Sequence, residues 1–230
     1  MHKFVFLYFL FFLLVFSYLN IRVDATEDLN VVFIDPGHGG LDGGCSYKDL
    51  VEKDINLKIA LKLRDSLEEA GYEVLMSRSA DIHLCKDKFS KKEDLVTRIE
   101  MINSSNADLF ISIHTNSFTN PKYFGSQVFY NGINPNNLLI ASNIQSYLSI
   151  FTKTTRVHKN LDNIMILRNI NKAGCLIETG FISNPNEYEL YQSDDYLIKL
   201  ANCIMYGIDD YFKVLWYIKK NVWLNKQSIV

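Results

Sequence analysis

The chain alternates between short apolar runs and longer segments of helical periodicity, and this alternation limits the folds open to it. Residues 31–35 (VVFID) form a β-branched apolar run that ends at Pro36, which predicts a buried strand. Residues 54–70 carry apolar side chains at helical spacing, and Gly71 follows where a helix often ends. Further strands are expected over 72–76, 108–114, 126–130 and 174–181, and further helices over about 94–104, 136–150 and 187–212.

This order of elements predicts a single α/β domain with a mostly parallel, twisted sheet and helices on both faces. In such sheets ligands bind beyond the carboxyl ends of the strands, so we expect the chemistry there. We place the folded domain at residues 29–212 and a C-terminal tail of unknown role at 213–230. The tail contains both tryptophans, and its apolar and basic mixture suits a membrane, a partner or packing on the domain.

The N-terminus carries a separate signal. Residues 4–19 hold no charged side chain and follow the basic start Met1-His2-Lys3, which is typical of a secretory leader. Small residues at Val23-Asp24-Ala25 offer a cleavage site, so residues 1–25 are either a signal peptide or an N-terminal membrane anchor. The apolar run is shorter than the roughly 20 residues of a usual membrane span. Both alternatives predict that the protein is exported.

Composition excludes some functions and leaves the redox state open. A formal net charge of -2 and a pI of about 6.2 argue against a nucleic-acid partner, which selects for basic surfaces. The cysteines Cys45, Cys85, Cys175 and Cys203 form no C-x-x-C pair, so a thiolate zinc site is not expected. We favour single thiols, although an exported chain with four cysteines allows three complete disulfide pairings.

Polar residues stand where two predicted strands end and where one helix begins. His38 lies in a glycine-rich turn directly after the first strand, and His114 lies at the tip of the strand 108–114. Glu52 stands just before the first long helix. Two imidazoles and one carboxylate, with a fourth position left for water, are typical of catalytic zinc sites. Each residue alone also has an ordinary structural interpretation, such as a helix-dipole role for Glu52.

Glu178 is the fourth unusual residue. It lies on the otherwise apolar strand 174–181, where a buried carboxylate is unfavourable unless it has a partner. A metal-bound water would be such a partner, and an ordinary position at the end of a strand is the alternative.

These residues fall within motifs that resemble the zinc-dependent N-acetylmuramoyl-L-alanine amidases of bacterial cell-wall turnover. The motifs are DPGHGGLDGG, VEKDINLKIALKLRDSLEEAGYEVLMSR, ADLFISIHTNS and LIETGFISNPNE, in the family's order. The resemblance extends from about residue 30 to residue 212. The segments between the motifs are most similar to the germination-specific amidases of endospore-forming bacteria.

The resemblance implies a function for the predicted site. His38, Glu52 and His114 would bind Zn²⁺, and Glu178 would be the catalytic acid and base. Asn116 would lie in the substrate groove. The reaction would be hydrolysis of the amide bond between N-acetylmuramic acid and L-alanine in peptidoglycan, either in spore-cortex maturation, where it leads to muramic-lactam, or in cell-wall turnover.

The same resemblance implies partners and a location. Peptidoglycan would be the substrate, residues 4–19 would give any membrane association, and an accessory protein could be needed for activity. The protein would act at the outer face of the membrane, in the cell wall or in the space between the forespore membranes. Two positions depart from the family pattern: Ala173-Gly174 replaces a common Pro-Ala, and Thr179 replaces an aliphatic residue.

Two other functions stay open at this level. A site of two histidines and a glutamate with a second glutamate also suits a zinc peptidase that cleaves within the stem peptide. A non-catalytic wall-binding protein could keep the fold without turnover, although such a protein has no need of a complete ligand set and Glu178.

Overall fold

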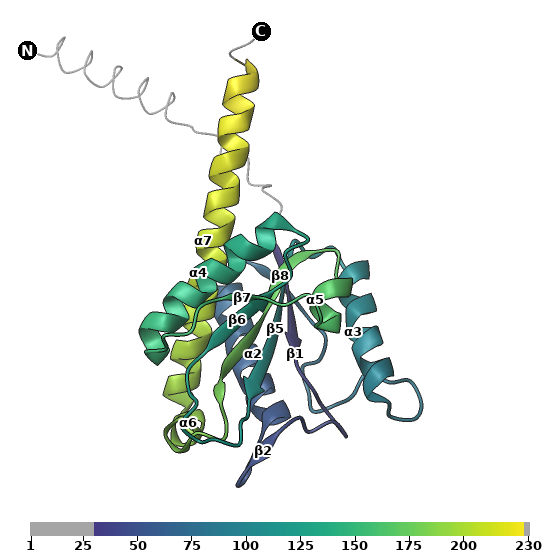
Figure 1. Ribbon diagram of the computed structural model, residues 1–230. Coiled ribbons are helices and arrows are strands. Elements are labelled where there is room, and N and C mark those ends of the chain that lie inside the picture. The colour runs from purple at the N-terminus through teal and green to yellow at the C-terminus, as the bar shows by residue number, and fades with distance from the viewer. Residues whose placement is uncertain (1–29, 228–230) are drawn as a thin grey trace, which may run out of the picture.

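A computed structural model describes residues 30–227 as a six-stranded sheet flanked by helices (Figure 1). The strand order is β4-β1-β5-β8-β6-β7, and β2 and β3 form a separate two-stranded sheet. The strands are β1 (Val31–Pro36), β2 (Ser46–Tyr47), β3 (Leu50–Val51), β4 (Glu73–Met76), β5 (Leu109–Asn116), β6 (Gln127–Tyr130), β7 (Lys159–Asn160) and β8 (Ala173–Phe181). The predicted leader, residues 1–25, lies outside the described residues.

Six helices connect and cover the strands. They are α2 (Glu52–Glu69), α3 (Lys91–Ser104), α4 (Pro135–Thr152), α5 (Met165–Asn169), α6 (Pro185–Tyr191) and α7 (Asp194–Gln227) among the residues that the structure describes. The five predicted strands and the first three predicted helices are present, with ends that differ by at most three residues. Periodicity located these elements because each one buries a full apolar face.

The predicted mostly parallel sheet is confirmed. β1 pairs in parallel with β4 and β5, and β5 pairs in parallel with β8. β6 pairs antiparallel to β8, although it pairs in parallel with β7. Apolar periodicity carries no information about strand direction, so it could not predict that β6 runs antiparallel to β8.

Alternating side chains of the buried strands supply two cores, one on each face of the sheet. Val32 and Ile34 of β1 pack with α2, α4 and α7 in the larger core. Val31 and Phe33 point to the opposite face and pack with α3 and α5 in the smaller core. The prediction of helices on both faces is therefore confirmed, as Figure 1 shows.

The predicted closing helix 187–212 is in fact two helices. α6 ends at Tyr191, and α7 begins at Asp194 after a turn at Gln192-Ser193. The Ser193 hydroxyl accepts a hydrogen bond from the Tyr196 N–H, as a helix N-cap does. The turn is only two residues long and apolar residues resume at Tyr196 and Leu197, which is why periodicity alone merged the two helices. Helix α7 then continues past residue 212 into the predicted tail.

Four short elements were not predicted, because they are too short to show a clear period. These are the β2–β3 hairpin, strand β7 and helix α5. The four cysteines are free thiols, in agreement with the preferred prediction, although Cys45 and Cys203 are only half-buried. Among residues 30–227, no helix combines the length and apolar character that crossing a membrane requires.

Two glycines allow close packing in this fold. A Cβ atom at Gly174 would lie 2.2 Å from the ring of Phe110 on the neighbouring strand β5, which explains the glycine at this departure from the family pattern. A Cβ atom at Gly207 of α7 would lie 2.7 Å from the Cα atom of Ile144 on α4. The two helices therefore meet with backbone nearly touching backbone.

We predict that Gly207→Ala destabilises the protein. Alanine favours a helix over glycine by about 1 kcal/mol, but forcing a methyl group against a packed backbone costs about 1–3 kcal/mol. A matched control is Lys199→Ala, an exposed position on the same helix whose ion pair with Asp195 contributes little. Thermal unfolding should show a lower Tm for Gly207→Ala only. A Tm at or above that of the unmodified chain would contradict the close packing of α4 and α7.

Candidate active site

The three predicted metal ligands come together at the carboxyl end of the sheet. His38 follows β1 in a left-handed conformation with φ 63°, His114 lies near the end of β5, and Glu52 is the first residue of α2. One potential ligand atom from each lies within 4.8 Å of the others. The sequence separates these residues by up to 76 positions, and the parallel topology of β1 and β5 brings them to one edge.

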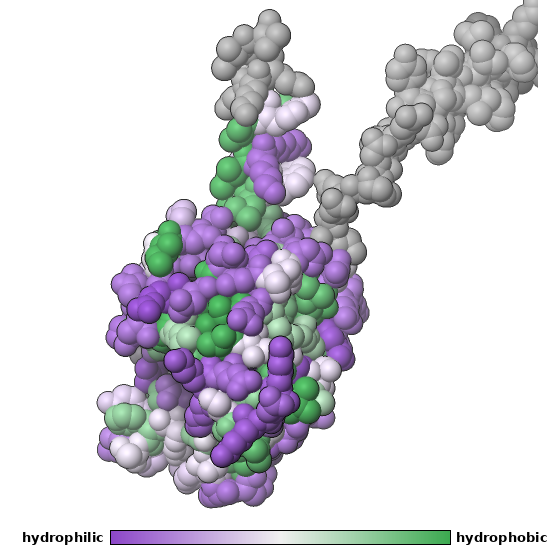
Figure 2. Space-filling view, turned by 90° about the vertical axis from the view of Figure 1, so that its right-hand side faces the viewer, coloured by the Kyte–Doolittle hydropathy of each residue, from purple (hydrophilic) through white to green (hydrophobic). Residues whose placement is uncertain are grey.

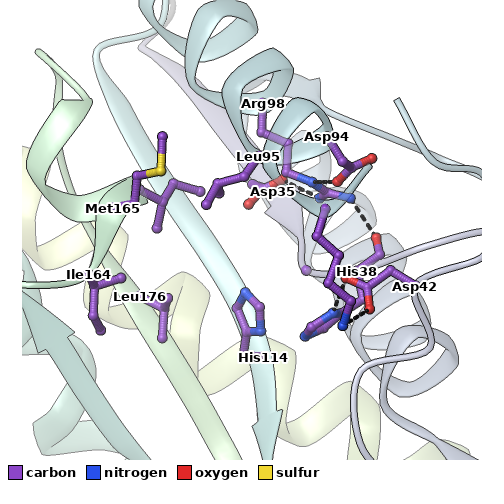
Figure 3. Close-up of a pocket in the computed structure, with 13 residues that line it drawn as sticks. Asp35, His38, Asp42, Asp94, Leu95, Arg98, His114, Ile164, Met165 and Leu176 are labelled. Atoms are coloured by element: carbon purple, nitrogen blue, oxygen red, sulfur yellow. Dashed lines mark hydrogen bonds and ion pairs between the residues drawn. The ribbon is translucent and has the colours of Figure 1, made fainter. Parts of the chain in front are cut away.

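Both imidazoles approach the same carboxylate oxygen. Nε2 of His38 lies 3.2 Å from Oε1 of Glu52, and Nδ1 of His114 lies 3.1 Å from that oxygen. The two rings are edge-to-face, with centroids 5.0 Å apart, and Figure 3 shows them next to each other among the residues that line the pocket. Two ring nitrogens and one carboxylate oxygen that converge in this way fit a divalent metal ion of borderline softness.

The protonation of the cluster follows from these contacts. Burial raises the pKa of Glu52, but hydrogen bonds from His114 and His38 outweigh this effect, so its pKa is lowered and it is a carboxylate. Burial lowers the pKa of His38, but Glu52 and Asp42 outweigh it, so the pKa of this ring is raised. The negative charges of Glu52 and Asp42 thus favour a cation in the cluster, either a proton or a metal ion.

Asp42 and Cys45 orient two of the ligands. Oδ2 of Asp42 lies 2.8 Å from Nδ1 of His38, which leaves Nε2 of that ring directed at Glu52. The backbone N–H of Cys45 donates to Oε2 of Glu52 at 2.9 Å. A carboxylate on the far ring nitrogen is the usual way in which proteins orient a histidine ligand.

A buried chain of polar side chains also reaches Glu52. Asn56 donates to Oε1 of Glu52 at 3.3 Å and accepts a hydrogen bond from the Thr115 hydroxyl at 3.0 Å. Thr115 and Thr179 are joined through their hydroxyls at 3.0 Å, and Thr179 is 3.3 Å from the hydroxyl of Tyr191. Thr179, the second departure from the family pattern, therefore connects β8 to the ligand on α2.

Arg98 of α3 holds the turn that carries His38. Its guanidinium donates to the backbone oxygens of Pro36 and His38 at 2.7 and 2.6 Å. It also forms ion pairs with Asp35 at 2.7 Å and with Asp94 at 2.6 Å, and all three side chains are buried. Burial raises the pKa of Asp35, but Arg98 outweighs it, so the pKa of this carboxyl is lowered.

Glu178 lies beside His114 in the register of β5 and β8, so their side chains point to the same face of the sheet. Its Oε2 atom is buried and has no hydrogen-bond partner among the described residues. Burial raises the pKa of Glu178 to about 7, and the neighbouring Glu52 carboxylate adds to the increase. A buried oxygen without a hydrogen-bond partner is typical of a group that binds a ligand or a water molecule.

A pocket of about 290 Å³ opens beside the histidines. One wall is polar and includes His38, Asp42 and Lys91. The opposite wall is apolar and is formed by Leu95, Ile164, Met165, Ile166 and Leu176 (Figure 3). Helix α5, which periodicity missed, supplies much of this apolar wall.

The structure places Asn116 two residues beyond His114, after an irregularity in the pairing of β5 with β8. Its Oδ1 atom accepts a hydrogen bond from the Ser117 N–H at 2.7 Å, so this oxygen stabilises the loop. Asn116 is half-buried near the cluster, and its predicted role in the substrate groove stays a prediction.

Several supporting residues were missed from the sequence. Asp42 follows His38 at a distance of four residues, and an aspartate in the same glycine-rich turn was the signal that could have found it. Asn56 lies one helical turn after Glu52, a spacing that places both on one face of α2. Arg98 carried no such signal, because its contacts to Asp35 and His38 join segments 63 and 60 residues apart.

Comparison with known proteins gives the family. Residues 32–210 match the family model described as N-acetylmuramoyl-L-alanine amidase. The germination-specific N-acetylmuramoyl-L-alanine amidase of Bacillus subtilis is 41% identical over 188 residues, which cover 79% of each chain.

Solved structures agree with this assignment. The CwlD amidase of Clostridioides difficile, determined in complex with the GerS lipoprotein, has a TM-score of 0.77 and 37% identity, and the match covers 80% of this chain and 99% of that chain. An N-acetylmuramoyl-L-alanine amidase from Clostridium difficile 630 has a TM-score of 0.72 and 32% identity, over 80% and 97% of the two chains. By sequence and by fold, this chain belongs to the N-acetylmuramoyl-L-alanine amidase family.

Proposed function

We propose that this amidase uses a zinc ion held by His38, Glu52 and His114, with Glu178 as the catalytic acid and base. The observation that supports the proposal most directly is the approach of two ring nitrogens to one Glu52 oxygen, beside the orphaned carboxyl of Glu178. The substrate is peptidoglycan, and the bond cleaved joins N-acetylmuramic acid to L-alanine.

The choice of zinc rests on the donor set. Mixed nitrogen and oxygen donors from three side chains, with one position left open, are typical of hydrolytic zinc sites. Softer ions select sulfur ligands, and magnesium and calcium select oxygen alone. A bound zinc ion would lower the pKa of a water molecule and polarise the scissile carbonyl group.

Glu178 supplies the proton transfers. Its buried carboxyl, with a pKa of about 7, is suited both to accept a proton from the attacking water and to return one near neutral pH. The proton then goes to the nitrogen of the departing L-alanine, so that the peptide leaves as a neutral amine. Because Glu178 and His114 are neighbours on adjacent strands, the attacking water can lie between the ligand cluster and the base.

The supporting contacts keep this geometry fixed. Arg98 holds the backbone of His38, Asp42 sets the direction of its ring, and Asn56 limits the rotation of the Glu52 carboxylate. Fixed donors need no rearrangement during the reaction, which is the main source of electrostatic catalysis in enzymes.

The similarity to the Bacillus subtilis germination-specific amidase and to the CwlD amidase supports a role in the spore cortex. In that setting the enzyme removes stem peptides as the first step towards muramic-lactam. We infer that the protein is exported and acts at the outer face of the membrane, in the cell wall or between the forespore membranes. The CwlD structure contains a lipoprotein, and we infer by analogy that an accessory protein also assists this chain.

We predict that Glu178→Gln abolishes hydrolysis while the protein still folds and binds zinc. Glutamine keeps the shape of the side chain but cannot accept the proton, and loss of a general base lowers rates by about 10²–10⁴-fold. The measurement is mass spectrometry of peptidoglycan incubated with the full chain and zinc, which detects peptides that end in a free L-alanine amine.

The matched control for this variant is Glu189→Gln, an exposed glutamate on α6, which should leave the rate unchanged. An active Glu178→Gln enzyme would assign the base to another residue. Cleavage between stem-peptide amino acids by the unmodified chain would instead indicate the zinc peptidase, and normal biological function of Glu178→Gln would indicate a wall-binding protein.

We also predict that His38→Ala and His114→Ala each reduce the zinc content of the purified protein well below one ion per chain. Asp42→Asn keeps all three ligands but weakens the orientation of His38, so zinc affinity should fall by about 10–100-fold. His158→Ala changes a histidine outside the cluster and serves as the control. Metal analysis and competition with a chelator measure both quantities, and an unchanged zinc content in either alanine variant removes that histidine from the site.

A further inference from the structure

The last part of helix α7 extends beyond the domain. Residues 213–227, here called the α7 overhang, continue the helix past the end of the sheet, as Figure 1 shows. Large apolar side chains on it are 40–64% exposed, which is unusual for an ordinary surface helix. They are Val214, Trp216, Tyr217, Ile218, Val222, Trp223 and Leu224.

The charge of helix α7 changes sign where the overhang begins. Residues 194–212 contain four aspartates and one lysine, whereas residues 213–227 contain four lysines and no acidic residue. Lys213 pairs with Asp209 at the junction, and the ammonium group of Lys220 lies 4.6 Å from the ring centre of Trp216. The overhang is therefore a cationic segment on a chain whose net charge is -2.

Apolar and charged residues are arranged along the overhang in rows. Val214, Ile218 and Val222 recur every four residues, so they form one apolar stripe along the helix. Lys213 and Lys220 lie on the opposite side at helical spacing, and Trp216 and Trp223 lie on that side with them. Figure 2 shows hydrophobic residues along one edge of this projecting helix and hydrophilic residues along the other.

The overhang also stands where the N-terminal segment enters the domain. Asn30, the first described residue, lines the same two surface pockets as Trp216. The 16-residue apolar run at residues 4–19 therefore ends only ten residues before a position beside the overhang. The active-site cluster lies at the other end of the sheet, because it follows the carboxyl ends of β1 and β5.

From these observations we propose that the α7 overhang binds the surface of an anionic lipid bilayer. Exposed tryptophan rings flanked by lysines are features that bind a helix in the interfacial plane of a membrane. Each lysine near an anionic surface strengthens binding by about five-fold. The helix lies on the bilayer rather than crossing it, in agreement with the lack of a described spanning helix.

This contact would orient the enzyme. Because α7 runs along the strand direction (Figure 1), an overhang in the interfacial plane places the metal-ligand cluster beside the bilayer, at the end of the domain far from the overhang. The binding proposal itself does not depend on the identity of the metal or on catalytic activity.

The chain supplies its own probe for a test. Trp216 and Trp223 are its only tryptophans, and both lie in the overhang, so intrinsic fluorescence reports on this segment alone. The full chain is mixed with vesicles of phosphatidylcholine containing phosphatidylglycerol or of phosphatidylcholine alone. With the anionic vesicles we expect emission at shorter wavelength, quenching by brominated acyl chains and protection from aqueous iodide.

Charge variants separate the overhang from the apolar leader. Lys219→Gln with Lys220→Gln should weaken the anionic-lipid effect by about 25-fold, which is two contributions of about five-fold. The matched control, Lys86→Gln with Lys88→Gln, removes the same charge from an exposed loop at the active-site end and should leave the fluorescence response unchanged.

Three outcomes would overturn the proposal. Tryptophans that stay accessible to iodide while the chain is attached to anionic vesicles would show that the leader alone binds lipid. Protection without vesicles would show that the leader packs on the overhang. Protection that depends on protein concentration but not on lipid would show that a second copy covers it.

Discussion

The buried ion pair between Arg98 and Asp35 is the interaction on which the active-site end of this fold depends. Asp35 lies near the end of the buried strand β1, and its carboxylate also accepts hydrogen bonds from Ser77, which follows β4, and from Ser112 of β5. The same guanidinium binds the backbone oxygen of His38. Removing one member of a buried pair generally costs about 3–5 kcal/mol, because the other charge is left without a partner. His38, the first proposed metal ligand, is thus positioned by an electrostatic contact to α3 and not by the sheet alone.

The remaining ligands obtain their positions from the sheet and from the start of a helix. β5 carries His114 at its end, and the β2–β3 hairpin leads directly into α2, so that Glu52 extends over the strand ends. The hydrogen-bonded chain through Asn56, Thr115 and Thr179 then joins three separate elements. A buried polar chain of this kind is stabilising only when each member has its partner. Its members therefore act as one unit with the metal-ligand cluster.

Much of this arrangement could be predicted from the sequence, and the physical reason is local. Continuous apolar runs located β1, β5 and β8 because these strands are buried on both faces, and the parallel topology then required that His38, His114 and Glu178 meet at one edge. The antiparallel β6 and the short helix α5 could not be predicted, since direction and very short elements leave no periodic trace. The roles of Arg98 and Asn56 could not be predicted for a different reason. Their roles arise from contacts made in three dimensions, and their residue types are ordinary for solvent-exposed helix positions.

The molecule has two chemically different ends, and the parallel sheet is the reason. Carboxyl ends of parallel strands share one edge, so the polar side chains at the ends of β1, β5 and β8 gather there and form the proposed hydrolytic site. The amino ends share the opposite edge, where β1 receives the N-terminal segment and α7 leaves the domain with its cationic, aromatic-rich turns. A fold that separates entry and exit of the chain from its active site can contact a surface with one end while the other end works on a polymer. Helix α7 packs on α2 and α4 and runs antiparallel to the central strands (Figure 1). Its C-terminal part therefore leaves the domain at the end opposite the active site, and this placement follows from the topology and not from any single residue.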